Sequence, residues 1–471
     1  MPNKRYDLIV IGSGPAGEKG AAQAAYFGKK VALIEREPVL GGAAANTGTI
    51  PSKTLRETAL YLSGFRQREM YGVNMTMDEK VTVRDFLFRE RLVKENERSR
   101  IMENLRRHKV DLLVGNACFV DPHTVSVKPA KSPEIQIQGE IILIATGSYP
   151  YRPASFPFHD PRVYDSDTIL SLRDIPPSML VVGGGAIGCE YACMFAALGI
   201  AVTVVEGHDR LVSFLDAEIS ESLRARMEGM GIRVRMPESV EMMHLEDAEI
   251  EVRLKSRTIL KTHTILAASG RRGNTEGLGL EKVGLGTDER GHIPVDGHYR
   301  TAVPNIYAAG DVIGFPALAS TSMEQARVAM VQAFDLKYKT NLASILPYGI
   351  YTIPECSMAG ETEQTLIGKK IPFIVGKAST ATNARGQIIG ENDGFLKLLF
   401  HEEDMKLLGV HMIGEQATEV IHVGLTALLM GGGADLFIQT CYNYPTLTEM
   451  YKYATYDALG SRAVKQKEKR R

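Results

Sequence analysis

Two glycine-rich turns in this sequence have the spacing that lets a polypeptide backbone approach a pyrophosphate. Gly12, Gly14 and Gly17 follow an apolar segment, residues 6–11, and precede a helical pattern. The first glycine permits the tight turn, the second lets the backbone approach the phosphates, and the third lets the helix pack closely on the strand. Glu35, at the end of the next apolar segment, is placed to accept hydrogen bonds from a ribose. This pattern predicts a dinucleotide site.

The same arrangement occurs a second time. Gly183, Gly185 and Gly188 form the second turn, and Glu206 takes the place of Glu35. Two complete motifs predict two dinucleotides, of which one is bound permanently and the other exchanges. A carboxylate at position 206 accepts from a ribose 2′-OH and repels a 2′-phosphate, so the second site should favour NAD(H) over NADP(H).

Each motif needs a strand before it and a helix after it. The pattern strand, turn, helix, strand is expected over residues 6–35 and again over 179–206, which predicts parallel sheets. Between them, the highly charged residues 83–107 are expected to form one long solvated helix. The recurrence of one unit indicates two related domains.

The C-terminal part has a different character. Strands expected at residues 395–400 and 407–412 precede a helix at 415–430, a pattern typical of an α+β domain whose sheet has a solvated face. The basic tail Val464–Arg471 has few apolar residues and is expected to be disordered and solvated.

The bulk composition is that of a globular protein. A chain of 471 residues, 44% hydrophobic and 24% charged, suggests two to four domains. A net charge of −1 gives no bias toward nucleic acid or an anionic membrane, and no apolar run is long enough to span a bilayer. The five cysteines have neither C-x-x-C nor metal-ligand spacing, so we expect no metal site and a reduced, cytoplasmic protein. Cys189 and Cys193, one helical turn apart, are expected to be core side chains.

Further segments carry a resemblance to a known family. They are Gly41-Gly42, Ile50–Lys53, Ala145–Gly147, Gly183–Glu190, Gly270-Arg271 and Ala309–Asp311. Through them the chain resembles the two-dinucleotide flavoprotein disulfide reductases over nearly its whole length. Within that family it is most similar to the soluble pyridine nucleotide transhydrogenases, in the segments Tyr164–Asp167, Phe214–Asp216, Gly349–Glu355 and Asn443–Thr446.

The resemblance implies an α/β fold with two Rossmann-like domains, which bind FAD and NAD(P), and a C-terminal α+β dimerisation domain. The FAD-binding domain is expected at residues 1–150 and 276–346, the NAD(P)-binding domain at 151–275 and the dimerisation domain at 347–471. Tightly bound FAD, exchanging NAD(H) and NADP(H), and a homodimer or larger homo-oligomer are implied as well.

The resemblance also implies site residues. Lys53 is expected near flavin N5, paired with Glu190, because a cation there stabilises the negative charge of the reduced flavin and the carboxylate holds it in place. The first glycine turn and Glu35 would hold the ADP half of FAD, and Asp311 would bond its ribitol or diphosphate region. The other residues expected to bind a cofactor are Arg36, Gly42, Thr47, Thr146, Gly147, Gly270, Arg271, Gly310 and Ala319.

The sequence departs from the disulfide reductases at the redox centre. Those proteins carry a cysteine pair between the positions of Gly42 and Ile50, whereas this chain has Ala44 and Thr49 there. Neither side chain can form a thiolate or a mixed disulfide, which excludes disulfide reduction by the usual route.

A second departure agrees with the first. The disulfide reductases present a His-Glu pair from the C-terminal domain to the partner's flavin; here Glu449 matches, but Tyr444 stands where the histidine would be. A tyrosine titrates near pH 10 and is a poor base for neutral thiol chemistry. Whether Tyr444 participates or only packs is left open by the sequence.

Three functions are compatible with these residues. A second nicotinamide can collect the hydride, which is transhydrogenation; a quinone, dye or oxygen can accept the electrons instead; or the chain is a nucleotide-binding scaffold that has lost catalysis. Transhydrogenation is favoured, although Glu206 counts against NADP(H). The cationic residues His208, Arg210, Arg271 and Arg272 are candidates to meet a 2′-phosphate.

Overall fold

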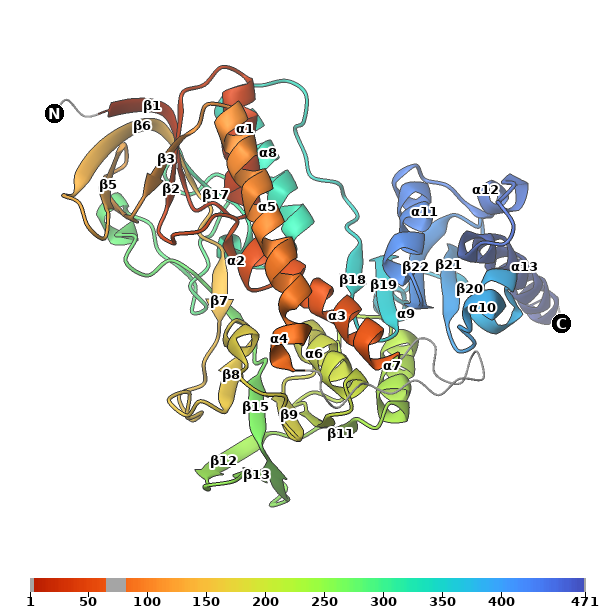
Figure 1. Cartoon of the computed structure of the whole chain (residues 1–471). Coiled ribbons are helices and arrows are strands. Elements are labelled where there is room, and N and C mark those ends of the chain that lie inside the picture. The colour runs from red at the N-terminus through yellow and green to blue at the C-terminus, as the bar shows by residue number, and fades with distance from the viewer. Residues whose placement is uncertain (1–3, 65–81, 470–471) are drawn as a thin grey trace.

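The computed structural model describes residues 4–64 and 82–469. The first part, built from the N-terminal residues and from residues 280–333, is a sheet covered by helices (Figure 1). Its elements are β1 (Lys4–Ile11), α1 (Pro15–Tyr26), β2 (Val31–Glu35), α2 (Gly42–Asn46), α3 (Thr49–Ser63), α4 (Val83–Phe86), α5 (Phe88–Arg107), β3 (Asp111–Val114), β4 (Asn116–Asp121), β5 (Thr124–Lys128), β6 (Ile135–Ile144), η3 (Leu280–Val283), β17 (Ile306–Ala308), η4 (Asp311–Ile313) and α8 (Ala319–Ala333). The strand order is β3-β2-β1-β6-β5-β4, with β17 also paired to β6. β1 pairs in parallel with β2 and β6, and its residues Leu8, Ile9 and Val10 are fully buried, as a sheet covered on both faces requires.

The middle of the chain forms a second parallel sheet, below the first in Figure 1. Its elements are β8 (Val163–Asp165), η2 (Thr168–Ser171), β9 (Ser178–Val182), α6 (Ala186–Ala197), β10 (Ala201–Val205), α7 (Ala217–Gly229), β11 (Arg233–Arg235) and β15 (Thr264–Ala267), with an antiparallel addition of β12 (Val240–Leu245), β13 (Ile250–Leu254) and β14 (Ile259–Thr262). The strand order is β11-β10-β9-β15-β8. The antiparallel pair β7 (Ser148–Pro150) and β16 (Arg271–Gly273) lies where the chain leaves and re-enters the first part. Both predicted strand–turn–helix–strand units are confirmed.

The C-terminal part is an antiparallel sheet with helices. Its elements are β18 (Tyr348–Ile350), β19 (Glu355–Gly360), α9 (Glu363–Gly368), β20 (Phe373–Ser379), η5 (Thr380–Thr382), α10 (Ala384–Ile389), β21 (Phe395–His401), β22 (Leu407–Gly414), α11 (Ala417–Leu429), α12 (Ala434–Gln439), η6 (Leu447–Glu449) and α13 (Met450–Lys469). The strand order is β18-β19-β22-β21-β20. This mixture of α/β and α+β parts is the predicted fold class.

The predicted solvated face of the C-terminal sheet is wrong. Lys397 and Leu398 are neighbours on β21 and therefore point to opposite faces, yet both are fully buried. α11 and α13 cover one face, and the start of α7 from the middle part meets the other. An alternation of apolar and polar residues along a strand does not predict a solvated face when the polar side chain has an ionic partner in another part of the chain.

Two further expectations need correction. The basic tail is ordered as far as Lys469, because it continues α13 and its Lys465 pairs with Glu402 at 2.7 Å; Arg470 and Arg471 lie outside the described residues. The charged segment 83–107 is two helices, α4 and α5, joined at Leu87, and not the one long helix that was expected; α5 buries Ile101 and Leu105 in the core of the first part.

Candidate active site

The first glycine turn joins β1 to α1 and is too crowded for side chains. Gly12 has a φ of +103°, and a Cβ on it would lie 2.4 Å from the carbonyl oxygen of Ala145. A Cβ on Gly17 would lie 1.9 Å from the carbonyl oxygen of Gly12. Gly14 is the N-cap of α1, and no side chain caps the helix there. The first N–H groups of α1 are thus available to an anion.

The residues around this turn fit a bound dinucleotide. A Cβ built on Gly14 meets nothing closer than the Cα of Gly42, at 3.9 Å, so the space in front of the turn is open. The hydroxyl of Thr146, in the segment between β6 and β7, is buried and has no hydrogen-bond partner among the described residues. A buried hydroxyl without a partner is costly, so a ligand atom that bonds it would stabilise the complex. The resemblance expects Thr146 at the FAD site.

Glu35 is held by a residue that the sequence analysis missed. Its Oε2 accepts hydrogen bonds from the main chain and the hydroxyl of Ser13, at 2.9 and 2.6 Å, and the Ser13 hydroxyl accepts from the Gly41 N–H at 2.9 Å. Ser13 occupies a variable position of the glycine motif, so the motif itself does not single it out. Arg36, beside it, donates to Asn274 at 3.3 Å.

Lys53 and Glu190 form an ion pair between the first and second parts. The ammonium of Lys53, on α3, lies 2.6 Å from Oε2 of Glu190, on α6. The Lys53 side chain is 28% exposed and that of Glu190 only 7%. Tyr351, from the C-terminal part, completes the group: its N–H donates to Glu190 Oε1 at 2.9 Å, and its ring lies 4.9 Å from the Lys53 ammonium. Tyr351 lies in a segment that supported the resemblance, but no role was predicted for it.

A second polar group connects the two dinucleotide parts. Arg271, on β16, donates to the hydroxyl and the carbonyl of Ser148, each at 2.8 Å, and pairs with Asp167 at 3.3 Å. The Ser148 hydroxyl donates to Asp311 at 2.8 Å. Burial raises the pKa of Asp167 even though Arg271 and a hydrogen bond from Thr47 oppose that shift. The predicted residues Thr47, Arg271 and Asp311 are therefore connected through Ser148 and Asp167.

The second glycine turn repeats the first. Gly183 has a φ of +114° and a Cβ on it would lie 2.4 Å from the carbonyl oxygen of Ala268, while a Cβ on Gly188 would lie 1.9 Å from the carbonyl oxygen of Gly183. A Cβ on Gly185, the N-cap of α6, meets no described atom within 4 Å. The turn is closed around its outer glycines and open at the middle one, which is the shape a pyrophosphate needs.

Glu206 connects this turn to the loop that follows β10. It accepts from the Gly184 N–H and, at 2.7 and 2.6 Å, from the main-chain N–H and the Nδ1 of His208. The other cationic candidates are bonded elsewhere: Arg271 as described above, Arg272 to the carbonyl of Glu289 at 2.7 Å, and Arg210 to the carbonyl of Ser213 at 3.1 Å. Of the four candidates, His208 is the one that contacts Glu206.

The remaining predicted residues fall into two groups. Gly42 and Gly310 lie beside the first turn, because a Cβ on Gly42 would lie 2.8 Å from the Cα of Gly14 and one on Gly310 would lie 3.1 Å from the Cβ of Ala16. Gly147 follows β6, Gly270 precedes β16 and Ala319 begins α8. Tyr444 and Glu449 lie instead in the segment between α12 and α13. Figure 1 shows these two helices on the side of the C-terminal part away from α3. The Tyr444 side chain is 73% exposed. One chain therefore does not bring Tyr444 and Glu449 to Lys53.

Comparison with known proteins identifies the family. The family described as pyridine nucleotide-disulphide oxidoreductase matches residues 6–333, and its dimerisation domain matches residues 346–455. The chain belongs to the pyridine nucleotide-disulphide oxidoreductase family. The match to the dimerisation domain supports a homodimer.

Relatives within this family share most of the chain. Proteins named soluble pyridine nucleotide transhydrogenase are 45% identical over 457 residues in Mycobacterium bovis (97% of each chain) and 43% identical over 458 residues in Pseudomonas putida (96% of this chain, 98% of the relative). A solved structure, the Cu(II) complex of the HOCl-induced flavoprotein disulfide reductase RclA from Escherichia coli, is similar with a TM-score of 0.87 at 26% identity, covering 96% of this chain and 99% of that one. FAD and nicotinamide nucleotides are the cofactors that this family implies.

This member of the family lacks thiols at the expected redox position. Ala44 lies in α2, and Thr49 is the first residue of α3, which also carries Lys53. The five cysteines are free, and Cys189 and Cys193 are fully buried, as predicted for core side chains. Burial raises the pKa of the Cys193 thiol to about 12, so this thiol is not a nucleophile at neutral pH. Among the described residues, no helix is long and apolar enough to cross a membrane.

Proposed function

We propose that this chain is an FAD-dependent NAD(P) transhydrogenase, which takes a hydride from one nicotinamide nucleotide and gives it to another. The observation that carries the proposal is the Lys53–Glu190 ion pair between the two dinucleotide parts, together with Ala44 and Thr49 where relatives that reduce disulfides carry cysteines. The names of the relatives at 43–45% identity agree with it.

In this proposal each glycine turn binds one nucleotide; the site at Gly12–Gly17 is called the first cradle and the site at Gly183–Gly188 the second cradle. The turn at Gly12–Gly17 and Glu35 hold the ADP half of FAD, and Thr146 supplies a hydroxyl to it. When bound, FAD accepts a hydride from one nicotinamide and passes it to the next. The turn at Gly183–Gly188 binds the two nicotinamide nucleotides in succession, so the reaction is ping-pong.

Lys53 provides the positive charge beside the flavin ring. Its ammonium is fixed by Glu190 at 2.6 Å and by the ring of Tyr351 at 4.9 Å, so the chain holds the charge in place before the reaction starts. A charge that is positioned in advance stabilises developing negative charge without a cost of reorganisation. Glu190 is 7% exposed and its second oxygen is bonded to the Tyr351 N–H, which keeps the carboxylate oriented.

Use of both nucleotides requires an account of Glu206. We propose that Glu206 accepts from the 2′-OH of NAD(H), and that the exposed ring of His208, with Arg210 two residues on, faces the 2′-phosphate of NADP(H). The His208 side chain is 76% exposed while its Nδ1 stays on Glu206, so a phosphate can approach it from solvent. NADP(H) is expected to be the weaker ligand.

The proposal extends to the assembly and location. FAD is expected to stay bound through purification, and the homodimer is expected to place Tyr444 and Glu449 of the partner subunit near Lys53. The domain boundaries at residues 150, 275 and 346, any larger homo-oligomer, and a cytoplasmic location remain part of the proposal.

The direct test is the redox state of the flavin in rapid mixing without oxygen. NADH and NADPH should each bleach the flavin absorbance, and NAD⁺ or NADP⁺ should then restore it. If neither reduced nucleotide bleaches the flavin, the proposal fails and a scaffold is the better reading.

One observation favours an alternative, an NADH:acceptor oxidoreductase. Glu206 is the residue type expected for NAD(H) alone. Bleaching by NADH but not by NADPH, with rapid reoxidation by a quinone, would establish that alternative.

A further inference from the structure

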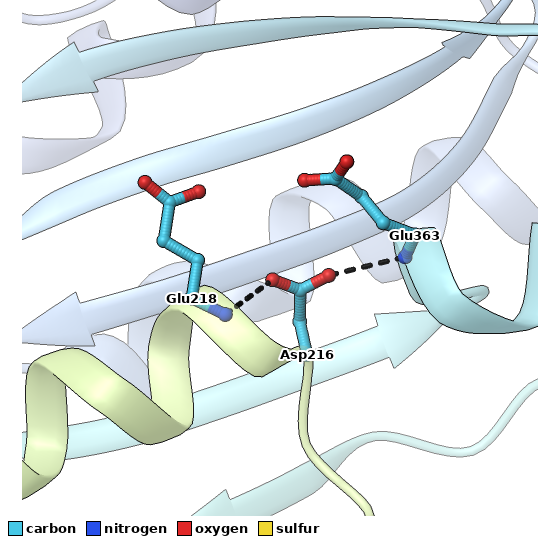
Figure 2. A group of neighbouring side chains, drawn as sticks. All are labelled: Asp216, Glu218 and Glu363. Atoms are coloured by element: carbon cyan, nitrogen blue, oxygen red, sulfur yellow. Dashed lines mark hydrogen bonds between the residues drawn. The ribbon is translucent and has the colours of Figure 1, made fainter.

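A buried cluster of charges joins the second dinucleotide part to the C-terminal part. Asp216, the N-cap of α7, is fully buried and accepts hydrogen bonds from the N–H groups of Glu218 at 3.2 Å and Glu363 at 3.1 Å (Figure 2). Glu363 is the first residue of α9. Figure 2 shows Asp216 between the starts of the two helices, with the carboxylates of Glu218 and Glu363 above it. One carboxylate thus accepts from the first turns of helices that belong to different parts of the chain.

Lys397 is the cation of this cluster. Its ammonium, from β21, lies 2.7 Å from Asp216 and 3.0 Å from Glu218, and it also pairs with Glu363. Burial opposes the charge of Lys397, but the hydrogen bonds to Asp216 and Glu363 outweigh it and raise the pKa of the ammonium. Oxygen atoms of the three carboxylates lie within 4.8 Å of one another, as in a metal site. Because the fully buried ammonium already occupies their centre, we assign the cluster to lysine and not to a metal.

The cluster lies at one end of the loop that follows Glu206. That loop, residues 207–215, begins at Glu206, on which the nucleotide ribose is proposed to bind, and ends at Asp216. Its middle is attached to the second glycine turn, because the Val212 N–H donates to the carbonyl of Gly184 at 2.8 Å. A Cβ on Gly184 would lie 2.6 Å from a methyl carbon of Leu211, so the loop packs directly on the turn.

The loop needs contacts outside itself to keep this conformation. Val212 has a φ of +43°, a left-handed value that a β-branched residue adopts only when its surroundings enforce it. Leu211 and Leu215 are buried, and Phe214 packs on Tyr348 of the C-terminal part with ring centroids 5.6 Å apart. The ionic anchor at Asp216 and this ring contact both come from the C-terminal part.

We propose that Lys397 is a positioning residue for the nicotinamide nucleotide: by holding Asp216, it fixes the loop 207–215 and with it the binding geometry at Glu206 and Gly184. The C-terminal part thereby sets the affinity of the second cradle, in addition to its place in the dimer. Lys397 acts through Asp216 and does not touch the nucleotide. This inference rests on the proposed use of the second cradle for NAD(H) and NADP(H).

The test compares NADH binding and flavin reduction in the dimeric holoenzyme. In Lys397→Met, the Kd of NADH from the concentration dependence of flavin bleaching should rise about tenfold, the size of a typical coupling between sites. The limiting rate of bleaching at saturating NADH should change less than twofold, because Lys53 and Glu190 are untouched. In a variant that keeps its FAD and its dimer, a merely structural role would instead lower the limiting rate along with the affinity.

The control and a second variant keep the result decisive. Lys369→Met removes a surface pair with Glu361 in the same part of the chain and should leave the Kd unchanged. If Lys397→Met loses FAD or the dimer, Glu363→Gln takes its place: it is partly exposed, keeps its N–H on Asp216 and removes one of the three charges that hold Lys397, so it should raise the Kd by a smaller factor of about three. An unchanged Kd in a folded variant would overturn the inference. Failure of NADH to bleach the wild-type flavin would instead overturn the proposed function.

Discussion

Glu206 and His208 bind each other: Nδ1 of His208 lies 2.6 Å from Oε1 of Glu206, and the His208 N–H donates to the same oxygen at 2.7 Å. Glu206 also accepts from the Gly184 N–H in the second glycine turn. One carboxylate therefore connects the turn proposed to hold the pyrophosphate with the histidine beside it. The ratio of the affinities for NAD(H) and NADP(H) should therefore depend on the Glu206–His208 pair.

Glu206→Ala should shift the preference toward NADPH. Removing the carboxylate removes an acceptor for the 2′-OH and a charge that repels a 2′-phosphate, so the ratio of the NADPH and NADH affinities should rise about tenfold, which corresponds to about 1.4 kcal/mol. The affinities are measured from flavin bleaching at varied nucleotide concentration. A ratio that stays at the wild-type value would remove Glu206 from ribose recognition.

His208→Gln tests the other half of the pair. The amide keeps a donor toward Glu206 but cannot carry a positive charge. We expect weaker NADPH binding by severalfold and nearly unchanged NADH binding, in the same measurement. Equal weakening of both nucleotides would mean that His208 only supports the loop.

Lys53→Ala should slow flavin reduction without releasing FAD. The ammonium is held by Glu190 and Tyr351 and is expected to supply about 2–4 kcal/mol of electrostatic stabilisation. The rate of bleaching should therefore fall by about 30-fold to 1,000-fold while the ratio of bound FAD to protein stays the same. Lys261→Ala, which removes an exposed surface pair with Glu246, serves as the control. Wild-type kinetics in Lys53→Ala would exclude the residue from the mechanism.

Reduction by NADH should not change the number of free thiols. All five cysteines are free, and Ala44 and Thr49 carry no sulfur. Thiol titration of the denatured protein should therefore give five thiols both before and after anaerobic treatment with NADH. A gain of two thiols on reduction would reveal a redox disulfide.

Stability should fall on mild acidification because of a buried histidine. His411, opposite Lys397 on β22, is fully buried, and burial lowers its pKa from 6.5 to about 4. The unfolded chain binds a proton at His411 below pH 6.5 while the folded chain stays neutral there, so the stability that this group contributes is present above pH 6.5 and is lost between pH 6.5 and 4. The loss amounts to about 3 kcal/mol if the full shift is realised.

The variant His411→Gln isolates this contribution. Glutamine does not titrate, so the melting temperature of the variant should change less between pH 7 and pH 5 than that of the wild type. Identical slopes in the two proteins would show that other groups determine the acid sensitivity.

The glycine turns show what a sequence can and cannot indicate. Gly12, Gly17, Gly183 and Gly188 are recognised because a Cβ at each would collide with backbone, a constraint that leaves a fixed spacing in the sequence. The pairing of Lys53 with Glu190 joins residues 137 positions apart and was expected only through the resemblance to a family. The spacing of residues along the sequence does not reveal such a contact between distant residues.

Other features were missed because the sequence contains no signal for the partner. Lys397, between apolar neighbours on β21, has the alternation of a strand with a solvated face. Its burial depends on acidic partners elsewhere in the chain, chief among them Asp216, the N-cap of α7 in the middle part. The basic end of α13 resembles a disordered tail until Glu402 is seen beside Lys465. Ser13 and Tyr351 are ordinary residues whose importance comes from the groups around them.

The most direct test of the central proposal is anaerobic hydride transfer from NADPH to thio-NAD⁺, alongside transfer from NADH to thio-NAD⁺, by the purified flavoprotein. The proposal predicts sustained turnover with both donors, slower or at higher nucleotide concentration with NADPH. Turnover with NADH and none with NADPH at any concentration would contradict it and leave an NADH-linked flavoprotein with another acceptor.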